Sequence, residues 1–489
     1  MNAPTTLNIA LLHLKIQPGA LEQNRHNLVC LAEQAADEGA RLIVAPELAV
    51  PGYLTECRAK VKPFVEELHG PTASLLSEVA RRRGVYLCVG FAERDPQTGI
   101  YYNSAAVLGP TGAIVAHHRK VGSERRWASP GAVTGESRFD TPWGRIGVLI
   151  CADTYFGLLP RSQALHGVNL LLVLANWPDC GLDPRELWRA RALENGFGVV
   201  ACNRTGFEPV LDFSSAHSYA VTGSGTTVAD LAAPESSICH VHYPLQDGIL
   251  AGAAREAILA RRSPDAYGPL SLNVNGLISF SGLWGLPEPG QLEVQCVVSS
   301  EFQMLTTSTD VAARLLVLPP SGPALDHTQV SALCESGQTA VVASVRSEQS
   351  GSPVFGLYAR DKLATLSSDS PATMVDFGPA RIALARAEAL RHPEMSIALS
   401  KQGCDLVVAP TDGTLSHDDR LVLGVKSVDR FAVVTIGANG ATICIPPVGH
   451  GRWEEQVLDG AGECHRQIDT TATRTKYFED RVDMPVLLR

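Results

Sequence analysis

The sequence predicts a layered sandwich of α-helices and β-strands that occurs twice in one chain. Short runs rich in β-branched residues alternate with longer segments of helical period, and Gly- and Pro-containing turns separate them. Five segments of the first half also return in the same order in the second half. The length of 489 residues fits this duplication, because one ordinary domain has ~100–200 residues. We therefore expect a mixed α/β (α+β) fold in two copies.

The strands of the first copy are predicted in short apolar runs bounded by turn residues. In chain order they cover residues 7–14, 40–48, 84–93, 104–110, 113–118, 145–153, 168–176 and 196–206. Two segments between them, 20–39 and 185–196, carry apolar residues at helical spacing and end in glycine, as many helices do. This order of strands and helices predicts sheets covered by helices.

A second cycle of the same pattern begins near residue 291. The matched segments are 7–12 with 292–298, 40–48 with 313–321, 144–153 with 380–389, 168–179 with 404–413, and 187–206 with 421–440. Each match alone is a generic strand, but five in one order indicate two copies of one fold. We therefore expect a first domain at residues 1–280, a Gly/Pro-containing linker at 281–291 and a shorter second copy at 292–489.

The composition argues against several classes of partner. A net charge of −10 without a basic cluster disfavours nucleic acid and anionic membranes. The first residues lack the basic and apolar regions of a signal peptide, and no apolar run reaches the roughly 20 residues that span a bilayer. The 12 cysteines include no C-x-x-C pair, which fits a reduced compartment better than a disulfide framework. We therefore expect a cytoplasmic protein.

Cys151 stands where an apolar strand ends, in the stretch GRIGVLICADTYF (144–156). A cysteine at such a place is rigidly held while its side chain is presented, and the N–H of Ala152 can point at a developing oxyanion. A buried structural thiol is the alternative for any single cysteine. Two charged residues favour the nucleophile: Glu47, which comes after an apolar run and a proline, and Lys120, which comes after the predicted strand at 113–118. A carboxylate base and an ammonium group beside a thiol form a coherent set for acyl transfer.

These three segments resemble the nitrilase, or carbon–nitrogen hydrolase, superfamily. Glu47 in APELAVPGY, Lys120 in HRKV and Cys151 in GVLICAD occur in the order of that family and at similar spacing. The resemblance extends over nearly all of residues 6–270 and includes the segments ANWP and RRSPDAY.

The resemblance implies both the fold and the chemistry. The fold would be a four-layer αββα sandwich, present twice, and Glu47, Lys120 and Cys151 would be its catalytic triad, with Glu124 in an auxiliary role. Glu47 would take the thiol proton, and the thiolate would attack a small amide or N-carbamoyl compound to form a thioester that water cleaves. The Ala152 N–H and the Lys120 ammonium would hold the oxyanion. No metal or other cofactor is implied.

The residues beside the nucleophile indicate the substrate class. True nitrilases usually follow the cysteine with Trp-Glu, whereas this chain has Ala152 and Asp153. The difference favours hydrolysis of an amide or carbamoyl group, with release of ammonia or an amine, over hydrolysis of a nitrile. Three alternatives stay open: a nitrilase, an acyltransferase that uses the same thioester, and a non-enzymatic scaffold.

Aromatic residues in or beside the catalytic segments are candidates for the substrate pocket. They are Tyr53, Trp127, Tyr155, Phe156 and Trp177. Such rings would wall an apolar or cyclic acyl group, while packing in the core is the alternative for each of them.

The second copy lacks the catalytic groups. Laid on the first copy, it has Pro320 opposite Glu47, Ala387 opposite Cys151, and no lysine in residues 366–370, where the counterpart of Lys120 falls. We therefore expect a degenerate copy that is kept for packing. Members of the superfamily pair through one face of the sandwich, so the second copy would supply an intramolecular pseudo-dimer, and association into a further homo-oligomer stays open.

Overall fold

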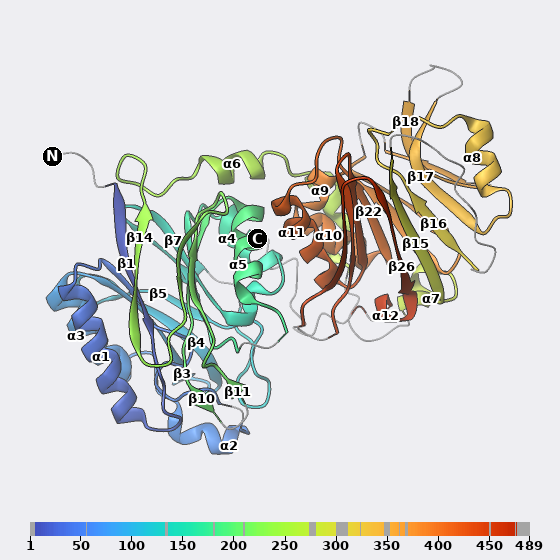
Figure 1. Cartoon of the computed structure of the whole chain (residues 1–489). Helices are drawn as coiled ribbons and strands as arrows, with labels where there is room; N and C mark the ends of the chain where they lie inside the picture. Colours follow the sequence, from blue (N-terminus) through green and yellow to red (C-terminus); the bar gives the residue numbers. More distant parts are fainter. Residues whose placement is uncertain are drawn as a thin grey trace. The chain divides into compact units, whose positions relative to one another are not determined.

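The computed structural model describes residues 5–54, 56–132, 135–178, 181–208, 211–272, 280–299, 312–322, 324–346, 353–360, 362–366, 370–448, 451–474 and 476. The chain forms two compact units, one with residues up to Ala260 and one that begins at Arg261 (Figure 1). This boundary lies before residue 280, where the sequence suggested the end of the first domain. The expected linker, 281–291, starts within a short helix, α7 (Phe280–Trp284), whose Trp284 Nε1 donates to Lys401 O at 2.8 Å inside the second unit.

Two six-stranded sheets form the centre of the first unit. The first sheet has the order β14 (Ser237–Pro244), β1 (Thr6–His13), β2 (Leu42–Val44), β3 (Tyr86–Arg94), β4 (Tyr101–Leu108), β5 (Ile114–Arg119). The second has the order β13 (Thr227–Leu231), β12 (Ser218–Val221), β9 (Gly198–Cys202), β8 (Leu170–Leu174), β7 (Gly144–Ile150), β6 (Arg138–Thr141). Three adjacent strands run parallel in each sheet: β1, β2 and β3 in the first, and β7, β8 and β9 in the second. Predicted site segments lie on or directly after these strands.

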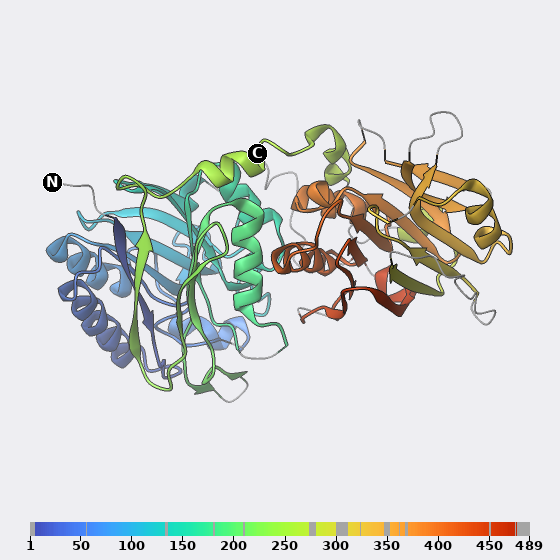
Figure 2. The same ribbon diagram turned by 45° about the horizontal axis from the view of Figure 1, so that its top comes forward.

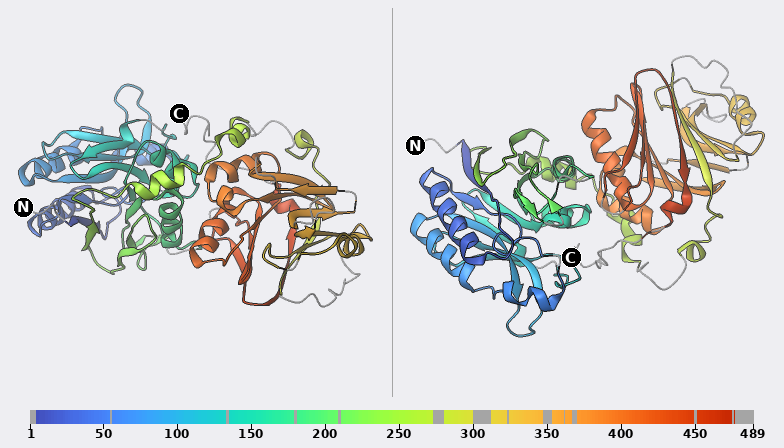
Figure 3. Two further views of the ribbon diagram at one scale, coloured as in Figure 1. Left: turned by 90° about the horizontal axis from the view of Figure 1, so that it is seen from above. Right: turned by 60° about the horizontal axis from the view of Figure 1, so that its bottom comes forward.

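Helices cover the outer face of each sheet in the first unit. The helices α1 (Leu21–Asp37) and α3 (Pro71–Arg83) lie on the first sheet, and α4 (Leu158–Leu165) and α5 (Pro184–Asn195) lie on the second (Figure 2, Figure 3). The unit also has shorter elements: α2 (Arg58–Val61), α6 (Ala253–Leu259), the 3₁₀ turns η1 (Lys62–Phe64), η2 (Gly135–Ser137) and η3 (Cys151–Thr154), and the hairpin β10 (Phe207–Glu208) and β11 (Leu211–Asp212). The predicted αββα sandwich is therefore confirmed.

Both faces of the first sheet are buried. On β1, Ala10 and Leu12 pack in one apolar cluster with Leu28 of α1. Because side chains alternate along a strand, Ile9 and Leu11 point the other way, toward the second sheet, and they are equally buried. This double burial explains why the strands appear in the sequence as continuous apolar runs rather than alternating ones.

The second unit repeats the arrangement. One sheet has the order β26 (Gly462–Asp469), β15 (Gln291–Val298), β16 (Arg314–Val317), β17 (Thr339–Arg346), β18 (Pro353–Ala359), β19 (Lys362–Thr365). The other has the order β25 (Glu454–Asp459), β24 (Gly440–Ile445), β23 (Ala432–Gly437), β22 (Leu406–Pro410), β21 (Ala380–Ala385), β20 (Ala372–Phe377). Its remaining helical elements are η4 (Pro264–Ser271), α8 (His327–Cys334), α9 (Ala387–Leu390), α10 (Pro393–Lys401), α11 (His417–Gly424), η5 (Val425–Asp429) and α12 (Thr470–Thr473).

The two units share strand order and pairing register. Each strand of the two sheets of the first unit has a counterpart at the same place in the second. Ile146 of β7 pairs with Leu170 of β8, and Ile382 of β21 pairs with Leu406 of β22, which are the residues that the sequence repeat aligns. The predicted duplication of the fold is therefore confirmed. In the described residues, no helix is both long and apolar enough to cross a membrane.

Candidate active site

Cys151 opens the 3₁₀ turn η3 directly after β7. Its backbone has φ +47°, a conformation that costs a non-glycine residue about 1–2 kcal/mol. Hydrogen bonds on both sides of the residue hold this turn: Asp153 Oδ2 accepts from Ile150 N at 3.1 Å, and Thr154 Oγ1 donates to Cys151 O at 2.8 Å. The turn takes Cys151 out of the strand, and the residue is 8% exposed.

Glu47 follows β2 and is 0% exposed. Its Oε1 accepts hydrogen bonds from Lys120 Nζ at 2.8 Å and from Asn103 Nδ2 at 2.7 Å. Its Oε2 accepts one from the backbone N–H of Asn176 at 2.8 Å. The next residue, Leu48, has φ +47°, so the chain turns sharply at this point as it does at Cys151. The carboxylate is thereby fixed from both sheets, because Asn103 belongs to β4 and Asn176 follows β8.

Lys120 and Glu124 complete a cluster of charged groups. Lys120 follows β5, is 2% exposed, and donates from Nζ to Glu124 Oε1 at 2.7 Å as well as to Glu47. Asn103 Nδ2 also donates to Glu124 Oε2 at 3.2 Å, so one amide group holds both carboxylates. The structure therefore brings together Glu47, Lys120 and Glu124.

Burial and charge set the protonation of the four groups. Burial, with the charge of Glu124 adding to it, raises the pKa of Glu47 above its ordinary value. Burial likewise raises the pKa of the Cys151 thiol well above its usual range, and the nearby Glu47 adds to the rise. Burial opposes the charge on Lys120, but Glu124 and Glu47 raise the pKa of this amine. Burial would raise the pKa of Glu124, but the Lys120 ammonium holds it below its ordinary value. Cys151 is therefore a thiol at rest and needs a base.

Among the predicted pocket aromatics, Tyr53 contacts the charged cluster. Its hydroxyl donates to Glu124 Oε1 at 3.3 Å, and burial raises the pKa of this phenol. Trp127 is buried in an apolar cluster with Leu54, and its Nε1 donates to Leu54 O at 3.0 Å. The structure therefore places Tyr53 beside the charged cluster of Glu47, Lys120 and Glu124, and Trp127 in a neighbouring apolar cluster.

The remaining predicted aromatics lie beside the turn that carries Cys151 and after β8. The rings of Tyr155 and Phe156 are both buried and meet edge to face, with centroids 5.1 Å apart. Trp177 follows Asn176, and its ring packs edge to face on that of Trp188 in α5, with the ring centroids 6.4 Å apart. Ala152, the predicted oxyanion donor, lies within η3 immediately after Cys151.

Sequence reasoning missed two asparagines that hold the site. Asn103 is 0% exposed within the apolar strand β4, and Asn176 binds Glu47 through its backbone N–H. A polar side chain inside an apolar strand is a usable signal, because a buried amide needs partners. In the described residues, no three His, Cys, Asp or Glu side chains are grouped as metal ligands.

A buried thiol with a carboxylate base and an ammonium group makes the first unit a candidate for acyl-transfer hydrolysis. The family model described as Carbon-nitrogen hydrolase matches residues 8–250, all within the first unit. The chain belongs to the carbon–nitrogen hydrolase family and is an enzyme that hydrolyses carbon–nitrogen bonds.

Several known proteins are similar to the first half of the chain. A protein named Nitrilase from Pyrococcus abyssi is 34% identical over 211 residues, which cover 42% of this chain and 78% of that protein. Omega-amidase NIT2 from Homo sapiens is 28% identical over 251 residues, covering 48% of this chain and 87% of that protein. The crystal structure of Nit3 from Saccharomyces cerevisiae has a TM-score of 0.46 and 24% identity, and covers 53% of this chain and 94% of that one.

Proposed function

We propose that the first unit hydrolyses a small linear amide or an N-carbamoyl compound through a thioester on Cys151. The observation that supports this most is the buried cluster in which Lys120 Nζ lies between Glu47 and Glu124, because the charges of all three groups act on the thiol of Cys151 in its strained turn. The raised pKa of the Cys151 thiol calls for a general base, and the raised pKa of Glu47 brings this carboxylate closer to the working pH of a base.

The reaction proceeds in two halves. Glu47 takes the proton from Cys151 Sγ, and the thiolate adds to the amide carbon. An ammonium group has three donors, of which Lys120 uses two on carboxylates, so the third and the Ala152 N–H hold the oxyanion. Glu47 then gives its proton to the leaving nitrogen, and ammonia or an amine departs. In the second half Glu47 deprotonates water, which cleaves the thioester and releases the acid and the thiol.

The relatives' names define the substrates to test. They include both nitrilase and omega-amidase, and the Ala152–Asp153 pair after the cysteine favours amides over nitriles. The aromatic side chains of Tyr53 and Trp177 are proposed to contact the acyl group.

Ammonia release from a panel of primary amides, N-carbamoyl compounds and nitriles tests the proposal. We expect turnover of an amide or carbamoyl compound, its loss in Cys151→Ala, and a mass increase equal to the acyl group on Cys151 after rapid quenching. Cys202→Ala is the matched control, because Cys202 is also a buried thiol with a strongly raised pKa and lies on β9. Turnover that survives in Cys151→Ala would refute the proposal, and a second acyl product on addition of an amine would indicate an acyltransferase.

A further inference from the structure

The carboxylate of Asp153, two residues after the proposed nucleophile, is fully buried and accepts four hydrogen bonds. Oδ2 accepts from His118 Nε2 at 2.8 Å and from Ile150 N at 3.1 Å. Oδ1 accepts from the backbone N–H groups of Val121 and Gly122, each at 3.0 Å. Two oxygens with two lone pairs each are thus fully used.

These four donors come from segments on both sheets of the first unit. Ile150 immediately precedes Cys151 on the second sheet, whereas His118, Val121 and Gly122 surround Lys120 on the first. His118 lies on β5 and Lys120 directly follows this strand, two residues further on, so the two side chains point to the same side of the sheet. Asp153 is therefore a direct bridge between the segment of the thiol and the segment of the ammonium group.

The bridge carries charge. Burial would raise the pKa of Asp153, but the hydrogen bond from His118 and the backbone donors hold that pKa below its ordinary value. The carboxylate is ionised and only accepts, so His118 carries its proton on Nε2. Hydrogen bonds to an ionised acceptor are shorter and stronger than neutral ones, and they fix the two segments firmly.

The second unit shows that the fold forms without Asp153. The shared register of β7–β8 and β21–β22 aligns Cys151 with Ala387 and Asp153 with Ala389. Cys151 opens the turn η3, and Ala387 opens α9 at the same place. The strand and a helical segment directly after it are thus kept where both the thiol and the carboxylate are absent, although the backbone at Ala387 lacks the positive φ of Cys151.

His118 is replaced in the second unit as well. The pairs β3–β4 and β17–β18 align Ala105 with Phe355. Ala105 pairs with His118, and the ladder of β18 and β19 places Leu366 in the corresponding position, where it packs on the apolar core. An acid–histidine bridge has become two apolar residues in the copy that lacks the thiol, so a role in the reaction explains the bridge better than a role in the fold.

We propose that Asp153 and His118 are positioning residues that hold the Cys151 turn and the Lys120 segment at the separation that the thiol addition needs. This proposal rests on the proposed roles of Cys151 and Lys120. Neither Asp153 nor His118 touches the reacting atoms, so their loss changes the rate of the chemical step more than substrate binding.

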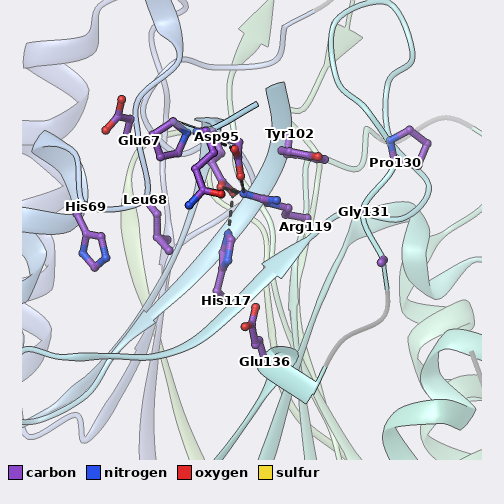
Figure 4. Close-up of a pocket in the computed structure, with 14 residues that line it drawn as sticks. Glu67, Leu68, His69, Asp95, Tyr102, His117, Arg119, Pro130, Gly131 and Glu136 are labelled. Atoms are coloured by element: carbon purple, nitrogen blue, oxygen red, sulfur yellow. Dashed lines mark hydrogen bonds and ion pairs between the residues drawn. The ribbon is translucent and has the colours of Figure 1, made fainter. Parts of the chain in front are cut away.

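The neighbouring residue His117 provides a matched control. His117 Nε2 lies 2.7 Å from Oε2 of the buried Glu93, so it forms the same kind of pair on the same strand. It faces the opposite side of the sheet, where Figure 4 shows it pointing into a hollow lined by Tyr102, Arg119 and other residues. A purely structural contribution of a histidine–carboxylate pair would appear equally in both variants.

The experiment compares His118→Gln, Asp153→Asn and His117→Gln in the full chain. We expect His118→Gln to lower kcat by about 10- to 100-fold with little change in KM, and to slow alkylation of Cys151 by iodoacetamide. Asp153→Asn should lower kcat further, because an amide group cannot accept four hydrogen bonds. His117→Gln should keep the parent kcat while losing a similar amount of thermal stability.

The outcomes separate this proposal from the proposed function. Equal kcat values for His118→Gln and His117→Gln, in a chain whose Cys151→Ala variant is inactive, would overturn the positioning role alone. An active Cys151→Ala variant would overturn the proposed function first. If Asp153→Asn does not fold, as judged by circular dichroism, the two histidine variants still decide the question.

Discussion

At the scale of the residue, Glu47 accepts hydrogen bonds at both carboxylate oxygens, from a lysine, an amide side chain and a backbone N–H. All of these donors favour the ionised form, while burial and the charge of Glu124 favour the protonated form, and the net result is a raised pKa. A base of this kind works only when ionised. The rate of a reaction that depends on it must therefore fall as the pH drops through this raised pKa.

We predict that Glu124→Gln moves the acidic limb of the kcat/KM profile to lower pH, by roughly one unit. The substitution removes the negative charge that raises the pKa of Glu47 and leaves Lys120 to act on Glu47 alone, so both effects lower that pKa. The measurement is the pH dependence of kcat/KM. The position of the acidic limb is compared, even if the maximal kcat/KM of the variant is lower. Tyr53→Phe, which removes a hydrogen bond to Glu124 but no charge, should leave the limb in place. A limb that does not move in Glu124→Gln would contradict the prediction.

The sequence predicted the identity of the charged residues better than it predicted their environment. Glu47, Lys120, Cys151 and Glu124 were all candidates, and the structure gathers the three charged ones by direct contacts. Asn103 was missed because its contact with Glu47 crosses from β4 to the end of β2, a proximity that depends on strand pairing and not on spacing in the chain.

At the scale of the element, the end of β2 passes unusually close to β3. An ideal Cβ on Gly90 would lie 2.6 Å from Pro46 O, 2.7 Å from Glu47 Cα and 2.8 Å from Leu48 N. All three atoms belong to the backbone and have no room to rotate away. Gly90 thus allows the turn that carries Glu47 to press against the sheet, and Ala49 N donates to Gly90 O at 2.9 Å across the same contact.

We predict that Gly90→Ala destabilises the first unit by about 1–3 kcal/mol and lowers kcat/KM at least tenfold, because Glu47 must shift to admit the methyl group. Thermal unfolding and steady-state kinetics measure the two effects. The matched variant is Ser344→Gly, at the corresponding position of β17, where Ser344 Oγ donates to O of Pro320, the counterpart of Glu47. Ser344→Gly should leave kcat/KM unchanged. Normal kinetics of Gly90→Ala would show that the close approach does not position Glu47.

The elements of the first unit were predictable where local sequence decides them. The helix predicted at 185–196 is α5, which begins after Asp183, whose side chain accepts from Arg185 N at 2.9 Å, and ends at Gly196 with φ +67°. The short helix α7 at the start of the predicted linker, 281–291, is held by a tertiary contact that local sequence does not indicate: Trp284 Nε1 donates to O of Lys401, the last residue of α10. The three-residue strand β2 is much shorter than the predicted run at 40–48: it ends at Val44, and the positive φ of Leu48 shows that the chain has already turned at the end of that run.

At the scale of the whole molecule, the two units combine one fold with different site residues. Pro320 and Ala387 replace Glu47 and Cys151, and the backbone at Ala387 lacks the positive φ of Cys151. The counterpart of Lys120 falls within residues 366–370, of which 367–369 lie outside the described residues. The role of the second copy as partner in a pseudo-dimer stays a prediction.

We predict that turnover loads at most one acyl group on each chain, and that this group is on Cys151. The second unit contains buried thiols, but burial, with the charge of Asp405 adding to it, raises the pKa of Cys404 to about 12, so this thiol stays protonated and unreactive. Rapid acid quenching during turnover, followed by intact mass and peptide mapping, measures both the number and the place of the acyl groups. The parent chain and Cys404→Ala should give the same single adduct, and Cys151→Ala should give none. An acyl group on a cysteine of the second unit would show that the second copy has kept a reactive site built from other residues.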